Sequence, residues 1–316
     1  MSSNNTRPVY SRDQLTQYFE RLKIPEKQRE YEAAGLKHDE ALAYLTLLQQ
    51  RHLVEIPFEN LTLHYSAHRQ VNIHPQELFK KIISDDNARG GYCMENNCLF
   101  GTLLYSLGFQ IFSAGARVNS NGTWTGWGHM VNIITINGIR YQVDVGFGGP
   151  GPIVPMPLER SGSIRSHIEP ASSRLQWRNI HENNDPDQRL WVYDHRINEK
   201  SDWTTIYCFT ELEFLPSDYA TMNYFSSTSP RTFFTRTIIG EKKIVGENGG
   251  IVGQLILGNT DLKWRIKGKK EKEIQFHSED DRVNALEEHF GIKLSQVERE
   301  GIRGLASEIS NKPHGV

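Results

Sequence analysis

Residues 89–97 read Arg89-Gly90-Gly91-Tyr92-Cys93-Met94-Glu95-Asn96-Asn97, and they place a cysteine after a basic residue and two glycines. The glycines permit a tight backbone that most side chains would forbid. Leucines then repeat at near-helical spacing until Gly108, so we expect a helix that begins at Cys93. Free backbone N–H groups and the helix dipole at such a position favour the thiolate, the nucleophilic form of cysteine. A buried cysteine that only packs in the core is the alternative.

Two strand-like segments follow, residues 131–136 and 139–145, and Asn137-Gly138 lies between them. Asn-Gly is the strongest short hairpin signal, and its two-residue turn fixes how the two strands pair. In that register His129 lies on the same sheet face as Asp144 and diagonal to it. Diagonal neighbours have Cβ atoms about 7–8 Å apart, so the imidazole can reach the carboxylate. A polar face of a solvated hairpin is the alternative interpretation.

Cys93, His129 and Asp144 together supply a nucleophile, a base and a carboxylate that orients the base, in that chain order. The base shares the thiol proton, and the carboxylate selects the imidazole tautomer and stabilises the imidazolium. Spacing alone does not place the helix start beside the hairpin. It also leaves several classes of Cys-His-Asp enzyme open.

Apolar patterning divides the chain into three parts. Residues 1–108 are predicted to be helical, with a capping box at Ser11 and Gln14. Residues 109–203 are strand-rich, and residues 204–316 mix strands with one helix at 278–290. These patterns predict an α+β fold. The polar stretch 159–189 is predicted to be a loop or insertion whose role the sequence does not give.

Blocks of sequence in all three parts resemble the arylamine N-acetyltransferase family. They come in the family's order and span most of the chain between about residue 15 and residue 240; the tail after about residue 290 is unmatched. The matching blocks are Ile56–Leu61, Arg89–Asn97, Thr125–Met130, Asp144–Gly148, Tyr207–Thr210 and Asn223–Phe234, which includes Thr228-Ser229-Pro230.

This resemblance implies a fold and an activity. The fold is an N-terminal helical bundle that carries the nucleophile, a central antiparallel β-barrel-like domain that carries the histidine and aspartate, and a C-terminal α/β lid at the coenzyme A cleft. The triad is similar to that of papain- and transglutaminase-like enzymes. The activity is transfer of an acetyl or related acyl group, such as propionyl or malonyl, from acyl-coenzyme A. The acceptor is an arylamine or arylhydrazine, and the acyl group passes through a cysteine thioester by a ping-pong mechanism.

The resemblance also implies further site residues. The acceptor pocket would be lined by Phe58, Val118 and Phe147. Coenzyme A would lie against Thr125, Gly126, Ser229, Arg231 and Thr232. The chain departs from the family at Arg231 and Thr232, where small hydroxyl residues are common near the coenzyme A phosphates. An arginine fork suits phosphate, and it could also change which acyl-CoA is preferred.

Composition fits an ordinary enzyme of 316 residues with a net charge of −2, which implies no nucleic-acid partner. The basic segment Lys263–Lys272 is interpreted as a solvated hairpin edge. We expect a cytoplasmic protein without a membrane segment, because Met1–Asn5 carries no apolar signal and the three cysteines lack a C-x-x-C pair. We expect no metal, since His64, His68 and His74 have no cysteine or carboxylate cluster beside them and are interpreted as surface polar contacts.

Two other functions remain open. A papain- or transglutaminase-like enzyme shares the triad but acts on peptides, and it gives Thr228-Ser229-Pro230 no purpose. A non-catalytic binding module descended from an enzyme is the second alternative. The intact triad argues against it, because a protein that has lost its activity tends to lose a catalytic residue.

Overall fold

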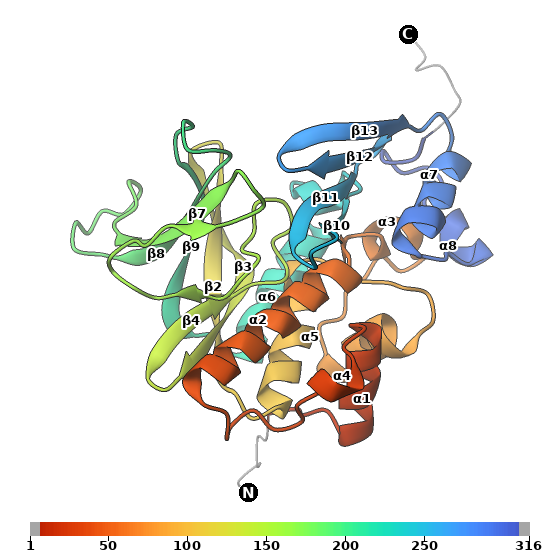
Figure 1. Ribbon diagram of the computed structural model, residues 1–316. Helices are drawn as coiled ribbons and strands as arrows, with labels where there is room; N and C mark the ends of the chain where they lie inside the picture. Colours follow the sequence, from red (N-terminus) through yellow and green to blue (C-terminus); the bar gives the residue numbers. More distant parts are fainter. Residues whose placement is uncertain (1–6, 310–316) are drawn as a thin grey trace, which may run out of the picture.

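Helices form the N-terminal third of the protein, and the computed structural model describes residues 7–309 (Figure 1). Met1–Asn5 therefore lies outside the described residues. The first helix begins as predicted, because the Ser11 hydroxyl accepts a hydrogen bond from the Gln14 N–H and the Gln14 side chain accepts one from the Ser11 N–H. The helices are α1 (Arg12–Arg21), α2 (His38–Glu55), α3 (Thr62–Tyr65), α4 (Pro75–Phe79) and α5 (Cys93–Ser106), with a 3-10 turn at Glu26–Gln28 and a π turn at Lys80–Ser84.

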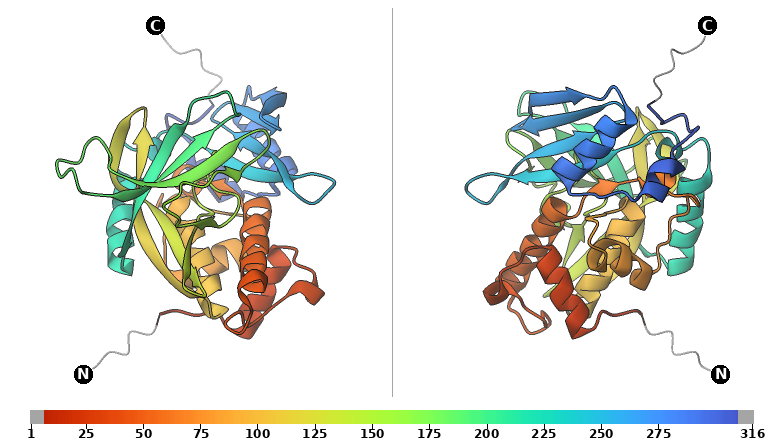
Figure 2. Two further views of the ribbon diagram at one scale, coloured as in Figure 1. Left: turned by 60° about the vertical axis from the view of Figure 1, so that its left-hand side comes forward. Right: turned by 90° about the vertical axis from the view of Figure 1, so that its right-hand side faces the viewer.

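The middle of the chain forms an eight-stranded sheet that curves into a nearly closed antiparallel barrel (Figures 1 and 2). The strand order is β5-β4-β3-β2-β9-β8-β7-β6. Strands near the two ends of this order approach each other: the Ser173 hydroxyl of β7 lies 3.9 Å from the Met156 sulfur of β5. The strands are β2 (Gln110–Ser120), β3 (Thr123–Ile136), β4 (Ile139–Val143), β5 (Met156–Pro157), β6 (Arg165–Ser166), β7 (Ser172–Arg178), β8 (Leu190–Arg196) and β9 (Thr204–Glu213).

The hairpin predicted at Asn137-Gly138 is confirmed. Strands β3 and β4 pair Ile136 with Ile139 directly across the turn. Both turn residues have positive φ, 47° for Asn137 and 82° for Gly138, as a two-residue turn that matches the strand twist requires. The register therefore brings Asp144, the residue that follows β4, beside β3.

A five-stranded sheet, β1-β10-β11-β12-β13, occupies most of the last third of the chain and is drawn mainly in blue in Figure 1. Its first strand, β1 (Phe58–Glu59), comes from the N-terminal part, and Phe58 also bridges Gly91 in the loop before Cys93. Lys263–Lys272 lies in the β12–β13 hairpin, as predicted. The other elements are β10 (Gly240–Val245), β11 (Ile251–Leu257), β12 (Asp261–Ile266), β13 (Lys269–Gln275), α6 (Pro216–Thr228), α7 (Glu279–Ala285) and α8 (Gln296–Gly301), with a 3-10 turn at Phe233–Thr235 and a π turn at Leu286–Phe290.

Three observations differ from the sequence expectations or extend them. Part of the polar stretch 159–189 is not a loop, because it contains β6 and the inner strand β7, whose Leu175 is buried. His64 is not at the surface: it is fully buried and hydrogen-bonds the Ser307 hydroxyl at 2.8 Å. β9, which begins just after the proposed boundary at residue 203, pairs with β2 and β8 in the large sheet.

Between residues 7 and 309, no helix is both long and apolar enough to span a bilayer. The same residues contain no group of three His, Cys, Asp or Glu side chains that could hold a metal ion.

Candidate active site

Cys93 is the first residue of α5, and Tyr92 precedes it in an extended conformation. The Glu95 carboxylate accepts a hydrogen bond from the Tyr92 N–H at 3.0 Å, which satisfies one backbone donor at the helix start. The helix dipole places positive potential at the thiol. Cys93 is only 4% exposed, and its sulfur lies 3.8 Å from the Gly128 carbonyl oxygen, one residue before His129. The structure thus brings the helix start and the hairpin together.

Gly90 and Gly91 are needed because other atoms approach them closely; neither has a positive φ. A Cβ at Gly90 would lie 1.8 Å from the Pro57 carbonyl oxygen, and one at Gly91 would lie 2.5 Å from the Glu95 Cβ. No side chain fits at these distances. The glycines therefore let the loop before Cys93 pack against β1 and the first turn of α5.

Arg89 does not act on the thiol, because it pairs with Glu59. The buried guanidinium donates to the Glu59 carboxylate, with 2.9 Å between Nε and Oε1. Burial alone would raise the pKa of the Glu59 carboxyl, but Arg89 and Lys81 outweigh it and lower that pKa to about 2. This ion pair fastens the loop to the end of β1.

His129 and Asp144 form a hydrogen bond of 2.7 Å between Nε2 and Oδ2, and both side chains are buried. A carboxylate only accepts hydrogen bonds, so the proton lies on Nε2. Nδ1 is then the nitrogen left for the thiol of Cys93. This is the order of contacts that the sequence predicts: thiol, imidazole, carboxylate.

The charges of this group favour an imidazolium. Burial alone would lower the pKa of His129, but Asp144 outweighs it, Cys93 adds to the effect, and the pKa rises to about 10. Burial alone would raise the pKa of Asp144, yet His129 and the bonds from Asn97 and Gly146 lower it. The imidazolium and the carboxylate therefore stabilise each other.

Asn97 is a residue of the candidate site that the sequence analysis did not identify. Its Nδ2 donates to Asp144 Oδ1 at 2.8 Å and to the Met130 carbonyl at 2.7 Å. Its Oδ1 accepts from the Val145 N–H at 3.0 Å. Asn97 follows Cys93 by four residues, so both side chains lie on one face of α5. That spacing is the signal that could have identified it.

Aromatic rings enclose His129. Phe147 meets the imidazole edge-on with ring centroids 5.2 Å apart, and Tyr207 lies at the same distance. Val118 pairs with Tyr207 across β2 and β9. Phe58 belongs instead to the apolar cluster that contains Cys93. Of the three expected acceptor residues, Phe147 is thus beside the imidazole, Phe58 shares the cluster of the thiol, and Val118 is the strand partner of Tyr207.

The residues expected at coenzyme A lie on two elements. Thr125 and Gly126 are exposed on β3, and a Cβ at Gly126 would meet nothing within 4 Å. Ser229, Arg231 and Thr232 form the turn after α6, where the Thr232 hydroxyl donates to the Ser229 carbonyl at 2.9 Å. The Arg231 side chain is exposed and makes no hydrogen bond or ion pair with residues 7–309. α6 packs against β3, which carries the first pair.

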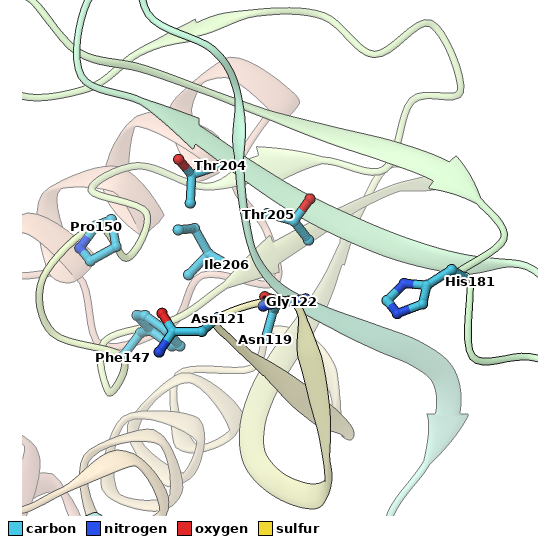
Figure 3. Close-up of a pocket in the computed structure, with 9 residues that line it drawn as sticks. All are labelled: Asn119, Asn121, Gly122, Phe147, Pro150, His181, Thr204, Thr205 and Ile206. Atoms are coloured by element: carbon cyan, nitrogen blue, oxygen red, sulfur yellow. Dashed lines mark hydrogen bonds between the residues drawn. The ribbon is translucent and has the colours of Figure 1, made fainter.

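A pocket of about 570 Å³ opens beside Phe147 (Figure 3). It combines apolar and polar side chains, contributed by the end of β2, the β2–β3 turn, the segment after Asp144, His181 and the start of β9. Its lining residues are Asn119, Asn121, Gly122, Phe147, Pro150, His181, Thr204, Thr205 and Ile206. Phe147 links this pocket to the triad, because the same ring contacts His129.

Comparison with known proteins agrees with this geometry. A family model described as N-acetyltransferase matches residues 41–299. The chain belongs to the arylamine N-acetyltransferase family. N-malonyltransferase FDB2 of Gibberella moniliformis is 36% identical over 96% of this chain and 94% of that protein. FDB2 of Fusarium pseudograminearum is 38% identical over 93% of both chains.

Solved structures of arylamine N-acetyltransferases share the fold. The enzyme from Mycobacterium abscessus has a TM-score of 0.76 and 23% identity over 92% of this chain and 93% of its own. The enzyme from Mycobacterium marinum in complex with CoA has a TM-score of 0.73 and 26% identity over 91% of this chain and 96% of its own. The fold is therefore the papain-like α+β fold of acyl-CoA-dependent N-acyltransferases, as expected.

Proposed function

We propose that the protein moves an acyl group from acyl-CoA to a small aromatic amine or hydrazine through a thioester on Cys93. One observation carries this proposal: the Cys93 thiol lies at a helix N-terminus beside an imidazole that the Asp144 carboxylate holds in a single tautomer. Three free cysteines fit a reducing compartment, so we place the reaction in the cytoplasm.

In the first half-reaction, the Cys93 thiolate attacks the thioester carbonyl of acyl-CoA. A C–S bond to Cys93 forms, the C–S bond to coenzyme A breaks, and the leaving thiolate takes the proton from the His129 imidazolium. Coenzyme A then departs as a thiol. Asp144 keeps the proton of the opposite nitrogen in place, so Nδ1 is free to give and take the reacting proton.

In the second half-reaction, the amine nitrogen attacks the thioester on Cys93. His129 takes the proton that the nitrogen loses, and the Cys93 thiolate leaves as the amide forms. The imidazolium–thiolate pair is thereby restored. The two half-reactions use one thiol and one base in turn, so the donor product leaves before the acceptor reacts.

The pocket beside Phe147 suits an aromatic acceptor. The rings and side chains of Phe147, Pro150 and Ile206 supply apolar contacts, while Asn and Thr side chains supply hydrogen bonds. Phe147 touches His129, so an amine that packs on this ring has its nitrogen near the base. Phe58 and Val118 are proposed to complete the acceptor's surroundings.

Coenzyme A is proposed to lie between β3 and the turn after α6. The open space over Gly126 lets a ligand approach the backbone beside Thr125. Arg231 offers an exposed guanidinium that suits phosphate oxygens. Ser229 and Thr232 shape the turn that presents it.

The preferred acyl group is proposed to be malonyl. Relatives named N-malonyltransferase are 36–38% identical over 93–96% of this chain. Relatives named arylamine N-acetyltransferase are 26–31% identical over 69–91% of it. The resemblance seen in the sequence leaves acetyl, propionyl and malonyl open, so acetyl is the main alternative, and a panel of acyl-CoA donors against one amine distinguishes them.

Mass spectrometry of the intact protein tests the proposal. Malonyl-CoA or acetyl-CoA alone should leave an acyl group on Cys93, and aniline should remove it as the anilide. Cys93→Ala should take up no acyl group. Absence of an adduct with every acyl-CoA, together with cleavage or transfer on a peptide, would support the papain- or transglutaminase-like alternative. Absence of both reactions would support a binding module.

A further inference from the structure

Four consecutive carbonyl groups, from Gly149 to Pro152, each accept a hydrogen bond from a side chain. The donors come from four separate parts of the fold: α2, the turn after β6, β8 and β10. The bonds are Lys243 Nζ to Gly149 O at 2.8 Å, Tyr193 Oη to Pro150 O at 2.9 Å, His167 Nε2 to Gly151 O at 2.8 Å and Gln49 Nε2 to Pro152 O at 3.1 Å. Loop carbonyls usually face water, so this degree of anchoring is unusual.

The four donor side chains are buried, and their chemistry makes each of them the hydrogen-bond donor to its carbonyl. Each is at most 8% exposed. A carbonyl oxygen only accepts, so His167 carries its proton on Nε2. Lys243 also pairs with Glu241, whose carboxylate accepts from the Gly149 N–H. Both backbone polar groups of Gly149 are therefore held from β10.

The anchored segment connects the triad to the pocket. Residues 147–152, which contain the four anchored carbonyls, follow Asp144 closely in the chain, and their first residue, Phe147, lies against His129. Phe147 and Pro150 both line the pocket. Gln49 connects Pro152, at the end of this segment, to Asp144, which precedes it. Its Nε2 donates to the Pro152 carbonyl and also lies 3.3 Å from the Asp144 carbonyl oxygen.

The anchors of the Asp144 carboxylate are separate from these bonds. That carboxylate is held by His129, Asn97 and the Gly146 N–H. The position of Phe147 and Pro150 depends instead on the backbone that follows, from Gly148 to Pro152. Loosening this backbone would move the pocket wall and leave the triad in place.

We infer that Gln49, His167, Tyr193 and Lys243 are positioning residues for the acceptor step. They hold residues 147–152 as a rigid wall against which the aromatic acceptor packs, with its nitrogen directed to His129. The inference rests on the proposed function. It assigns these residues to the second half-reaction and not to thioester formation.

A double variant, Tyr193→Phe with His167→Leu, removes two of the four bonds. Tyr193→Phe keeps the ring that stacks on Tyr207 with centroids 5.0 Å apart. We expect the KM for aniline to rise about tenfold, since small displacements of bound reactants are costly. The rate of coenzyme A release in the first turnover, without amine, should stay within about twofold, since the triad keeps its own anchors. A second double variant, Tyr193→Phe with His167→Gln, retains an N–H donor at position 167. Its KM for aniline should return most of the way to the wild-type value.

Tyr44→Phe is a matched control, because the Tyr44 hydroxyl is also buried and donates to a backbone carbonyl, that of Glu30, at 2.8 Å. It should leave the KM for aniline unchanged. If the double variant does not fold, Tyr193→Phe alone makes the same comparison. Faster hydrogen exchange confined to residues 146–152 would support the inference without use of activity.

Two results would overturn the inference: an unchanged KM for aniline in the double variant, or equal losses in thioester formation and transfer. Failure of the wild-type protein to form a thioester on Cys93 would instead refute the proposed function. In that case the exchange measurement still decides whether these side chains hold the segment.

Discussion

Asn97 Nδ2 donates a hydrogen bond to Asp144 Oδ1 at 2.8 Å, so the helix that begins with Cys93, the proposed nucleophile, also holds the carboxylate at the far end of the proposed triad. Any movement of α5 relative to the sheet would therefore displace both Cys93 and Asp144. A Cβ at Gly146 would lie 2.6 Å from the Cys93 carbonyl oxygen, so the segment after Asp144 packs directly on the helix start. Cys93, His129 and Asp144 are thus fixed by a helix, a strand and a loop that contact one another.

Asn97→Ala should slow thioester formation by about 10- to 100-fold, a range typical when an orienting residue outside the reacting groups is lost. The change also leaves the Met130 carbonyl and the Val145 N–H without their partner, so the melting temperature should fall. Rapid-quench measurement of coenzyme A release checks the rate. Asn132→Ala is the control, since it removes an equally buried amide that bonds the Asn97 carbonyl and the Ser113 hydroxyl. Equal rates in the two variants would contradict the orienting role.

Asp144→Asn should lower the rate of acyl transfer by at least about 10²-fold; the corresponding change in a serine protease costs about 10⁴. Asp144 Oδ1 accepts from Asn97 and Gly146, so a new amide would keep its oxygen there. Its NH₂ would then face His129 Nε2 and force the proton to Nδ1, the wrong nitrogen for a base that must accept the thiol proton. Nitrogen-15 NMR of the imidazole should show the exchanged tautomer. Near-normal transfer by a folded Asp144→Asn protein would refute the triad.

Cys93 should be alkylated by iodoacetamide at pH 6 far faster than Cys98 and Cys208. Asp144 raises the pKa of His129 to about 10, so at pH 6 the proposed nucleophile Cys93 lies beside an imidazolium at the start of a helix, a setting typical of reactive cysteines. Burial raises the pKa of Cys98 and of Cys208 to about 12. Peptide mapping after a short reaction gives the three rates. His129→Gln should slow Cys93 selectively, and equal rates for all three thiols would exclude the ion pair.

The sequence could predict those parts of the site that local signals fix. Cys93 lies at a helix start because glycines and leucines mark that start, and Asn137-Gly138 fixes the register that brings Asp144 to His129. The four-residue spacing from Cys93 places Asn97 on the same face of α5, but its bond to Asp144 could not be predicted, because that partner is distant in the chain and only packing of α5 on the sheet defines the contact. The four donors to residues 149–152 lie up to 103 positions from their acceptors, and no local pattern joins them. In β7, the polar residues around Leu175 concealed an inner strand.

The stability of the protein should fall between about pH 6.5 and pH 10 through His129. Its pKa rises from 6.5 to about 10 on folding, because Asp144 outweighs the effect of burial. A group with a raised pKa contributes its full stability below the unfolded value and loses it as the pH passes the folded value. Urea unfolding of the wild type and His129→Gln at pH 6, 8 and 10 isolates this contribution. The difference between the two proteins should shrink as the pH rises, and a constant difference would contradict the shift.

Arg231→Ala should raise the KM of every acyl-CoA alike, by about three- to tenfold, because an exposed charge contributes modestly to phosphate binding. Initial rates with malonyl-CoA, acetyl-CoA and propionyl-CoA check this, and the lines in double-reciprocal plots should stay parallel as the amine is varied. Arg231→Lys should raise the KM for acyl-CoA less than Arg231→Ala does, because it keeps a positive charge. Arg303→Ala removes an arginine that is also exposed, and it should leave that KM unchanged. A loss confined to malonyl-CoA would mean that Arg231 binds the free carboxylate of the acyl group and not the phosphates. Intersecting lines without acylated Cys93 would exclude the covalent route, because the acyl group would then pass directly from donor to amine in a ternary complex.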